Sequence, residues 1–345
     1  PATSVLEDAG LPGPADLMER LTSISGQYDM DTVFLSNSGA EAVENALKIS
    51  YDHTHGKYTI TCRGAFHGRT LGTLSLNRSK EVYRREFPEI ASVHDIPFCS
   101  DRHCSPESCD CGFFFDETSS LREMIGTGGY VNPDEVACLV MEPIQGEGGY
   151  RLPSDAFMNE IATLSDQYDL PLVVDEVQSG LGRTGEWWAS DHYAVEPDVI
   201  ASAKSTRVGA TISREEIFPS EKSRLSSTWG AGDLISSAQG VLTIDAIEEY
   251  NLLANATERG RQMKELLRDE DLDSVVDVRG KGLMLAAEFE NKEIRDAVQE
   301  EAFSRGFLIV GCGKRTMRML PPLDVTPREI ELGAELFAKS VRAVC

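Results

Sequence analysis

Two short apolar segments of this 345-residue chain each lead to an ionisable residue. Residues 172–174 are followed by Asp175, and residues 199–203 are followed by Lys204. Prolines precede both segments, so each is expected to be a buried strand that carries its charge at the carboxyl end. Ligands of open α/β sheets bind in the crevice beyond these strand ends. The acid and the amine are therefore candidates for one shared site.

An acid and an amine in one crevice suit a particular kind of cofactor. Pyridoxal phosphate (PLP) needs a lysine for its Schiff base and an acid beside its pyridinium nitrogen. The alternative is that Asp175 and Lys204 are unrelated charges at two strand ends, the lysine being solvated. On these two residues alone, both interpretations stand.

A turn of small residues earlier in the chain could bind phosphate. Residues 32–35 are expected to form a strand, and Ser38, Gly39 and Ala40 lead into a helix with apolar residues at helical spacing. The free N–H groups and the dipole of a helix N-terminus attract anions. A plain serine cap is the alternative. Neither a P-loop nor a GxGxxG fingerprint is present, so nucleotide binding has little support.

The loop 63–70, after an expected strand at 58–62, holds Phe66, His67 and Arg69 between two glycines. Phe66 could stack on a flat ring, and Arg69 could bind a carboxylate through two parallel hydrogen bonds. A core phenylalanine and a surface arginine are the alternative.

Three further charged residues are expected at positions with little access to water. Glu142 and Glu147 lie in a Gly-rich loop after the expected buried strand 137–141, and carboxylates there must be solvated or paired. Arg318 lies within a short expected strand, 317–320, just before two prolines.

Strands alternate with helices along the first two thirds of the chain, which predicts a mostly parallel sheet with helices on both faces. Helices are expected at 15–21 and 154–169 and a further strand at 208–212. A long helix, about 233–267, then leads to a smaller C-terminal unit. The elements expected there are strands at 282–286, 307–310 and 317–320, a helix near 292–304 and a last helix after Thr326-Pro327.

The net charge of −24 argues against nucleic acid as a partner. Acidic residues spread along the whole chain favour a protein that works in high salt, as in a halophile, over an ordinary acidic enzyme.

No run of 18 apolar residues occurs and the first ten residues do not form a signal peptide, so we expect a cytoplasmic protein that does not enter a membrane.

Four of the eight cysteines, Cys99, Cys104, Cys109 and Cys111, fall in one short segment. They could bind zinc, but the single residue between the last two is tight for two ligands and matches no zinc signature. A disulfide or redox pair, or free thiols in a surface loop, are the alternatives.

Seven segments together resemble the class III (ω-) aminotransferases of PLP fold type I. They occur in family order over nearly the whole chain: NSGAEAVENALK, GAFHGRT, EPIQGEGG, VVDEVQSGLGRTG, the lysine of VIASAK, STWG and RMLPPL. The resemblance implies an α/β fold, with a mostly parallel sheet sandwiched by helices in a large domain and a smaller C-terminal α+β domain. It divides the chain into a remnant of an N-terminal segment (1–27), a large PLP-binding domain (28–245) and a small domain (246–345).

The resemblance also implies roles at the cofactor. Lys204 corresponds to the Schiff-base lysine and Asp175 to the partner of the pyridinium nitrogen. The other implied cofactor-binding residues are Ser38, Gly39 and Ala40 at the phosphate, Phe66 and Val177 on the two ring faces, His67, Gln178 near the ring hydroxyl, and Thr228. Thr228 resembles a residue that reaches the phosphate of the neighbouring subunit's cofactor, which implies a homodimer with shared active sites.

The implied substrate-binding residues are Arg69, Glu142, Glu147, Ser226 and Arg318. Arg69 resembles the residue that holds a substrate carboxylate. Glu147 and Arg318 resemble a switch pair, joined when an ω-amine binds and parted when Arg318 binds the α-carboxylate of 2-oxoglutarate. The implied reaction moves a terminal amino group from a donor such as L-lysine, 4-aminobutyrate or ornithine to 2-oxoglutarate, giving a semialdehyde and glutamate.

Two features bear on the donor. Residues 205–209 replace the Gly-rich loop of most relatives, and together with 224–230 and 63–70 they resemble lysine 6-aminotransferases more than 4-aminobutyrate enzymes. Members of the family also carry several tens of residues before the position of Pro1, so we expect part of the substrate pocket to lie outside this sequence.

Two other functions remain open on the same scaffold. An amino-acid racemase or mutase would use the same lysine, although Glu147 and Arg318 favour two alternating substrates and hence transamination. A binding protein that has lost catalysis is the second alternative, and the presence of both Lys204 and Asp175 argues against it.

Overall fold

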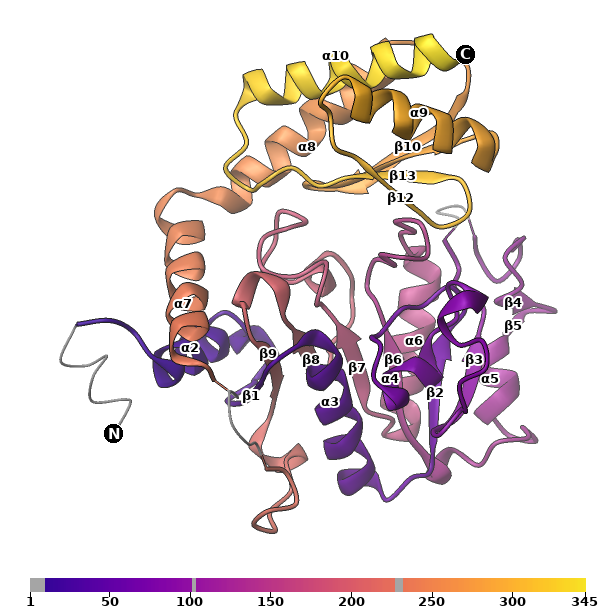
Figure 1. Cartoon of the computed structure of the whole chain (residues 1–345). Helices are drawn as coiled ribbons and strands as arrows, with labels where there is room; N and C mark the ends of the chain where they lie inside the picture. Colours follow the sequence, from indigo (N-terminus) through magenta and orange to yellow (C-terminus); the bar gives the residue numbers. More distant parts are fainter. Residues whose placement is uncertain (1–9, 101–103, 227–231) are drawn as a thin grey trace.

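The computed structural model of the chain describes residues 10–100, 104–226 and 232–345, and Figure 1 shows their arrangement. A seven-stranded sheet forms the centre of the larger part. Its strands, in spatial order, are β1 (Thr32–Ser36), β9 (Gly209–Ser213), β8 (Val199–Ser202), β7 (Leu172–Asp175), β6 (Val136–Met141), β2 (Tyr58–Cys62) and β3 (Ser92–Ile96). Only β9 runs against its neighbours, so the predicted mostly parallel sheet is confirmed.

Alternate residues of the central strands enter two separate cores. On one face Leu172 and Val174 pack with residues of α6 (Asp155–Tyr168), and on the other face Val173 packs with residues of α3 (Gly39–Thr54). Side chains of successive strand residues point to opposite faces, which accounts for the continuous apolar runs of the sequence. The shorter helices around this sheet are α2 (Pro14–Ser23), α4 (Leu71–Leu76) and α5 (Ser120–Ile125).

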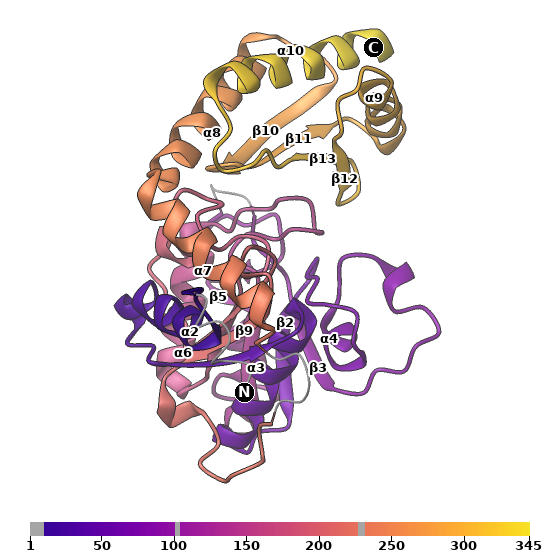
Figure 2. The ribbon, with the colours of Figure 1, turned by 60° about the vertical axis from the view of Figure 1, so that its left-hand side comes forward.

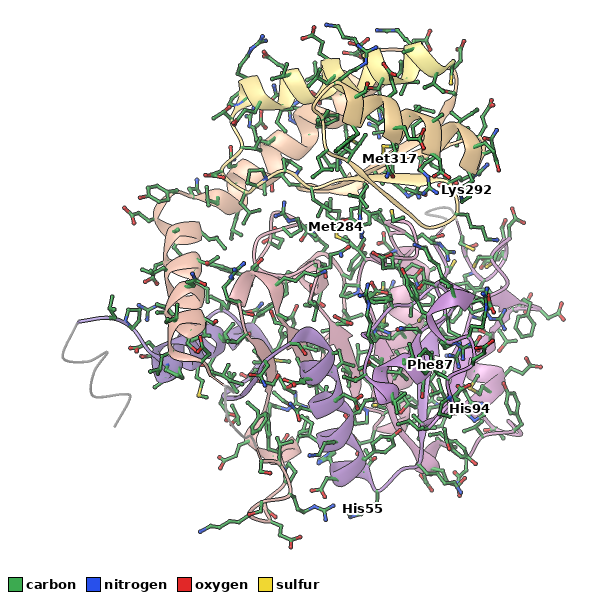
Figure 3. The ribbon with its side chains drawn as sticks, viewed as in Figure 1. His55, Phe87, His94, Met284, Lys292 and Met317 are labelled. Atoms are coloured by element: carbon green, nitrogen blue, oxygen red, sulfur yellow. The ribbon has the colours of Figure 1, made fainter. Side chains whose placement is uncertain are left out.

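A four-stranded antiparallel sheet forms the smaller C-terminal part. Its order is β10 (Val275–Lys281), β11 (Met284–Phe289), β13 (Thr316–Met319) and β12 (Val310–Cys312), and the helices beside it are α8 (Leu252–Asp269), α9 (Lys292–Ser304) and α10 (Pro327–Val344). Figure 3 shows Met317 on the side of these helices and Met284 facing the loops of the large sheet. The boundary at residues 245–246 stays a prediction.

The single long helix expected at 233–267 is wrong. Two helices occupy the segment, α7 (Leu234–Glu249) and α8, and Asn251 lies between them with φ 51°. A left-handed residue ends a helix, and asparagine adopts this conformation more readily than most. The chain thereby changes direction where it passes from the large sheet to the small one, as Figure 2 shows.

The strand expected at 307–310 begins later, at Val310. The N–H of Phe307 donates to the carbonyl of Ala302 (2.9 Å) and that of Gly306 donates to Phe303 (3.0 Å). These bonds close the C-terminus of α9 in the manner of a Schellman turn, with Gly306 at φ 77°. Strands β3 and β10 were not expected, because half-exposed residues interrupt their apolar pattern.

The turn between β10 and β11 packs closely against α8 on one side and against the larger part of the molecule on the other. A Cβ on Gly260 of α8 would lie 1.9 Å from the carbonyl oxygen of Gly282, in the turn between β10 and β11. A Cβ on Gly282 would lie 2.4 Å from the carbonyl carbon of Thr184. The N–H of Leu283 donates to the carbonyl of Arg183 (3.0 Å). Within the described residues, no helix is both long and apolar enough to cross a bilayer.

Because backbone fills the place of the missing side chain, Gly260→Ala is expected to lower the free energy of unfolding by about 2 kcal/mol. Gly333 in α10 is the matched control, since its Cβ would meet nothing nearer than 3.9 Å. Gly333→Ala is expected to raise stability by about 0.5 kcal/mol through helix propensity. Urea unfolding measures the free energy of unfolding of both variants. Equal changes in the two variants would contradict the close approach of Gly260 to Gly282.

Candidate active site

The parallel pairing of β7 with β8 brings the predicted acid and lysine to one edge of the sheet. Asp175 is the last residue of β7 and lies opposite Ala201 of β8. Lys204 begins the short 3₁₀ turn that follows β8, with φ 46°. Both residues line a cavity of about 890 Å³. A larger hollow, about 1580 Å³ and bordered by β10, contains none of the residues predicted for the site.

Most of the predicted residues line this cavity. They are Ser38, Gly39, Ala40, Phe66, His67, Arg69, Glu142, Glu147, Asp175, Val177, Gln178, Lys204 and Arg318. Ser226 is exposed and does not line it. Thr228 lies outside the described residues.

Asp175 is buried and held by two neighbours. One carboxylate oxygen lies 2.8 Å from Nδ1 of His67, and the other accepts the N–H of Val177 (3.1 Å). The backbone N–H of His67 donates to Oδ1 of Asn77 (2.6 Å), which orients the loop that carries the imidazole. The carboxylate therefore has a fixed position and further acceptor capacity toward the cavity.

Lys204 lines the cavity and is exposed to solvent there. Because the surrounding protein disfavours its charged form, the pKa of Lys204 lies below the usual lysine value, although Asp175, Glu142 and Glu147 partly oppose this shift. A lysine of this kind releases its proton more easily than one in free solution.

The first turn of α3 forms a cradle at the cavity wall. The side chain of Ser38 accepts the N–H of Glu41 (3.2 Å), and that of Glu41 accepts the N–H of Asn37 (2.5 Å). The N–H groups of Gly39 and Ala40 belong to the first turn and have no acceptor within the helix. A Cβ on Gly39 would lie 2.7 Å from Cγ1 of Val177, so the glycine allows the helix end to approach the strand-end loop.

Glu142 joins two of the loops around the cavity. Its carboxylate accepts the N–H of Phe66 (3.0 Å) and the N–H of Gly146 (2.7 Å). Burial raises the pKa of Glu142 to about 7, with the Asp175 carboxylate adding to the shift and His67 opposing it. Both oxygens thus already have backbone donors, and the residue holds the loops more than it offers a free charge.

Glu147 and Arg318 form an ion pair that spans the two sheets. Nη1 of Arg318, on β13, lies 2.7 Å from Oε1 of Glu147, and the second oxygen accepts from the hydroxyl of Tyr83 (3.2 Å) and Nζ of Lys80 (3.3 Å). Although burial opposes it, the charge of Arg318 lowers the pKa of Glu147, and Lys80 adds to this effect. The carboxylate is therefore ionised and fully paired.

Lys80 and Tyr83 were missed at the level of sequence. They follow the 63–70 loop in a segment with no motif, and only the folded chain brings them to Glu147. Tyr83 also packs edge-on against Phe66, with 5.2 Å between ring centroids. Arg183 lines the cavity too, and its Nη1 donates to the carbonyl of Pro321 (2.6 Å).

The groups around the cavity fit the PLP expected from the sequence. An amine and a carboxylate lie at one edge, and a helix N-terminus suited to phosphate faces the same space. Within the described part of the chain, the buried Oε1 of Gln178 has no hydrogen-bond partner and could accept from a ring hydroxyl. Phe66 and Val177 supply apolar contacts for a flat ring.

Comparison with known proteins gives a consistent result. The family model described as "Aminotransferase class-III" matches residues 12–341. The lysine aminotransferase from M. tuberculosis is 30% identical, with a TM-score of 0.86, over 96% of this chain and 80% of that chain. The ornithine aminotransferase from Toxoplasma gondii is 26% identical, with a TM-score of 0.80, over 96% and 77% of the two chains. An amine transaminase from an uncultivated Pseudomonas species, solved with PLP bound, is 26% identical, with a TM-score of 0.81, over 96% and 80%.

Proposed function

The chain belongs to the class III aminotransferase family and is a PLP-dependent transferase, and we propose that it transfers a terminal amino group to 2-oxoglutarate. The donor that we favour is L-lysine, with ornithine and 4-aminobutyrate as the other members of its class. Support comes from the similarity to the lysine and ornithine aminotransferases, and from the loops at 63–70 and 205–209.

The observation that carries this proposal is the ion pair between Glu147 and Arg318 in the wall of the cavity. A transaminase binds two substrates in turn at one site. While the pair is closed, the guanidinium is neutralised and the site suits the uncharged stem of an ω-amine. When the pair opens, Arg318 is free to bind a carboxylate of 2-oxoglutarate with two parallel hydrogen bonds. Lys80 and Tyr83 remain as partners for Glu147 in the open state.

The other residues of the cavity would hold the cofactor. Lys204 would bind it covalently, Asp175 would pair with its pyridinium nitrogen, and the N–H groups of Gly39 and Ala40 would bind its phosphate. When bound, PLP supplies an electron-withdrawing ring that accepts the electron pair left on a carbon as its proton departs.

Lys204 has a second task as the general base. Once a substrate amine has displaced it, its Nζ takes the proton from the substrate carbon, and its lowered pKa increases the neutral fraction that can do so. Asp175, kept in place by His67 and the N–H of Val177, would offer its carboxylate to the ring nitrogen. Arg69, exposed at the rim of the cavity, would bind the carboxylate of the donor.

A homodimer is part of the proposal. The sequence around Thr228 supports a contact with the cofactor phosphate of a second subunit, as the family resemblance implies. Ser226 is exposed and does not line the cavity of its own chain, so its proposed contact with substrate is at the site of the neighbouring subunit.

A donor screen tests the proposed function. L-lysine, ornithine, 4-aminobutyrate, diaminobutyrate and alanine are each supplied with 2-oxoglutarate in high salt, and glutamate is measured. We expect the fastest glutamate formation with lysine and a rate at least tenfold lower with alanine. A tenfold lower rate corresponds to about 1.4 kcal/mol less stabilisation of the transition state. If no amine yields glutamate but an L-amino acid loses optical activity, the protein is a racemase instead.

Glu147→Gln separates the two half-reactions. The variant leaves the Arg318 charge unpaired, so the reaction with the ω-amine donor should fall about tenfold or more in kcat/KM. The reaction with 2-oxoglutarate should be unchanged or faster, because no ion pair must first be broken. Single-turnover absorbance of the cofactor measures each half-reaction by itself.

The matched control for this variant is Glu335→Gln, an exposed carboxylate of α10 that pairs with Lys339. It should change neither half-reaction. An equal loss in both half-reactions of the Glu147→Gln variant would show that the residue is structural and not a switch.

A further inference from the structure

A cluster of four thiols lies in the larger part of the molecule, outside the candidate active site. The sulfur atoms of Cys99, Cys104, Cys109 and Cys111 all lie within 4.8 Å of one another. Cys99 and Cys104 are buried, the other two are half-buried, and all four are free thiols. None of them lines the cavity that contains Lys204.

Local structure explains how the chain gathers these sulfurs. Ser105 and Ser108 exchange two backbone hydrogen bonds (2.9 and 3.1 Å) around a tight turn, which places the flanking Cys104 and Cys109 side by side. After Cys111, Gly112 adopts φ 79° and turns the chain toward the core. Phe113 is fully buried there against Phe157 of α6, with 4.6 Å between ring centroids.

The single residue between Cys109 and Cys111 does not prevent both sulfurs from binding the same metal ion. Their sulfur atoms lie 3.0 Å apart, and the sulfurs of Cys104 and Cys111 lie 3.7 Å apart. A zinc ion with Zn–S bonds of about 2.3 Å in a tetrahedron has sulfur–sulfur edges of about 3.8 Å. An iron–sulfur cluster interposes several atoms and holds its cysteine sulfurs farther apart.

We propose that Cys99, Cys104, Cys109 and Cys111 bind one zinc ion in a structural site. Four thiolates around one position are the donor set of closed zinc sites, which leave no open coordination place for catalysis. Binding displaces the thiol protons and leaves a net charge of −2 on the site. It changes no oxidation state.

The surroundings of the cluster supply groups that suit thiolates. The N–H of Phe114 points to Sγ of Cys109 (3.4 Å), and the hydroxyl of Ser154 donates to Sγ of Cys99 (3.5 Å). Such outer hydrogen bonds orient metal ligands and stabilise their charge. The guanidinium of Arg151 lies beside this segment, donating to the carbonyl of Phe98 (3.0 Å), and partly offsets the negative charge.

The site joins segments that support the catalytic loops. The N–H of Ser154, which caps α6, donates to the carbonyl of Cys99 (2.9 Å). Arg151 donates both to Ser100 (3.1 Å) and to Oε1 of Gln145, in the loop that carries Glu142 and Glu147. A zinc ion would therefore fix an otherwise irregular segment beside α6, and its loss would loosen the support of that loop.

Metal analysis of the full chain with PLP bound tests the proposal. Protein produced with zinc and then desalted should contain about one zinc ion per chain. The Cys109→Ser/Cys111→Ser variant should retain less than about a tenth of it and should melt at a temperature lower by roughly 5 °C or more. Cys345→Ser is the matched control, because this exposed cysteine lies at the C-terminus and should leave zinc content and melting unchanged.

A second measurement needs no variant and so remains valid if the double variant does not fold. Co²⁺ added to zinc-free wild-type protein should give the red-region absorption of tetrahedral cobalt with four thiolates, and equimolar Zn²⁺ should abolish it. Two results would overturn the proposal: a wild-type protein that takes up neither metal, or a mass showing a Cys109–Cys111 disulfide in protein kept under reducing conditions.

Discussion

The parallel pairing of β7 with β8 is the constraint on which the candidate active site depends. It places Asp175 opposite Ala201 and so brings a buried carboxylate and Lys204 to the same edge of the sheet. A buried carboxylate requires partners, and His67 and the N–H of Val177 supply them. Desolvation by the surrounding protein lowers the pKa of Lys204 at the same edge, as the proposed role of a general base requires.

The small sheet completes the site from the other side. Arg318 reaches from β13 to Glu147, and the turn at Gly282 lies between α8 and the backbone of Thr184. A half-buried ion pair is a poor source of stability, because desolvation offsets much of its attraction. The proposed exchange of substrates gives this pair a role that does not depend on stability. The close approach of Gly282 to Thr184 and the hydrogen bond from Leu283 to Arg183 link the two parts without burying a charge.

The sequence was sufficient for features that are encoded locally. Asp175 and Lys204 follow apolar runs, and Ser38 precedes a helical pattern, so their places could be predicted. The break at Asn251 and the helix end at Phe307 are also local, but each depends on one left-handed residue that the apolar pattern does not reveal. The approach of Lys80 and Tyr83 to Glu147 is set by tertiary contacts and could not be predicted. The cysteine spacing argued against a metal site, whereas the turn at Ser105–Ser108 places Cys104 beside Cys109 and the folded chain brings all four sulfurs within 4.8 Å of one another. The high-salt habitat, the cytoplasmic location and the homodimer stay predictions.

The measurement that tests this account most directly is borohydride reduction of the PLP-loaded protein, followed by peptide mapping with mass spectrometry. Reduction makes the bond between the cofactor and its lysine permanent. The account predicts a label on the peptide that contains Lys204 and on no other, and no covalent label in the Lys204→Ala variant. A label on a different lysine, or an unlabelled wild-type protein with PLP bound, would contradict the placement of the active site at the ends of β7 and β8.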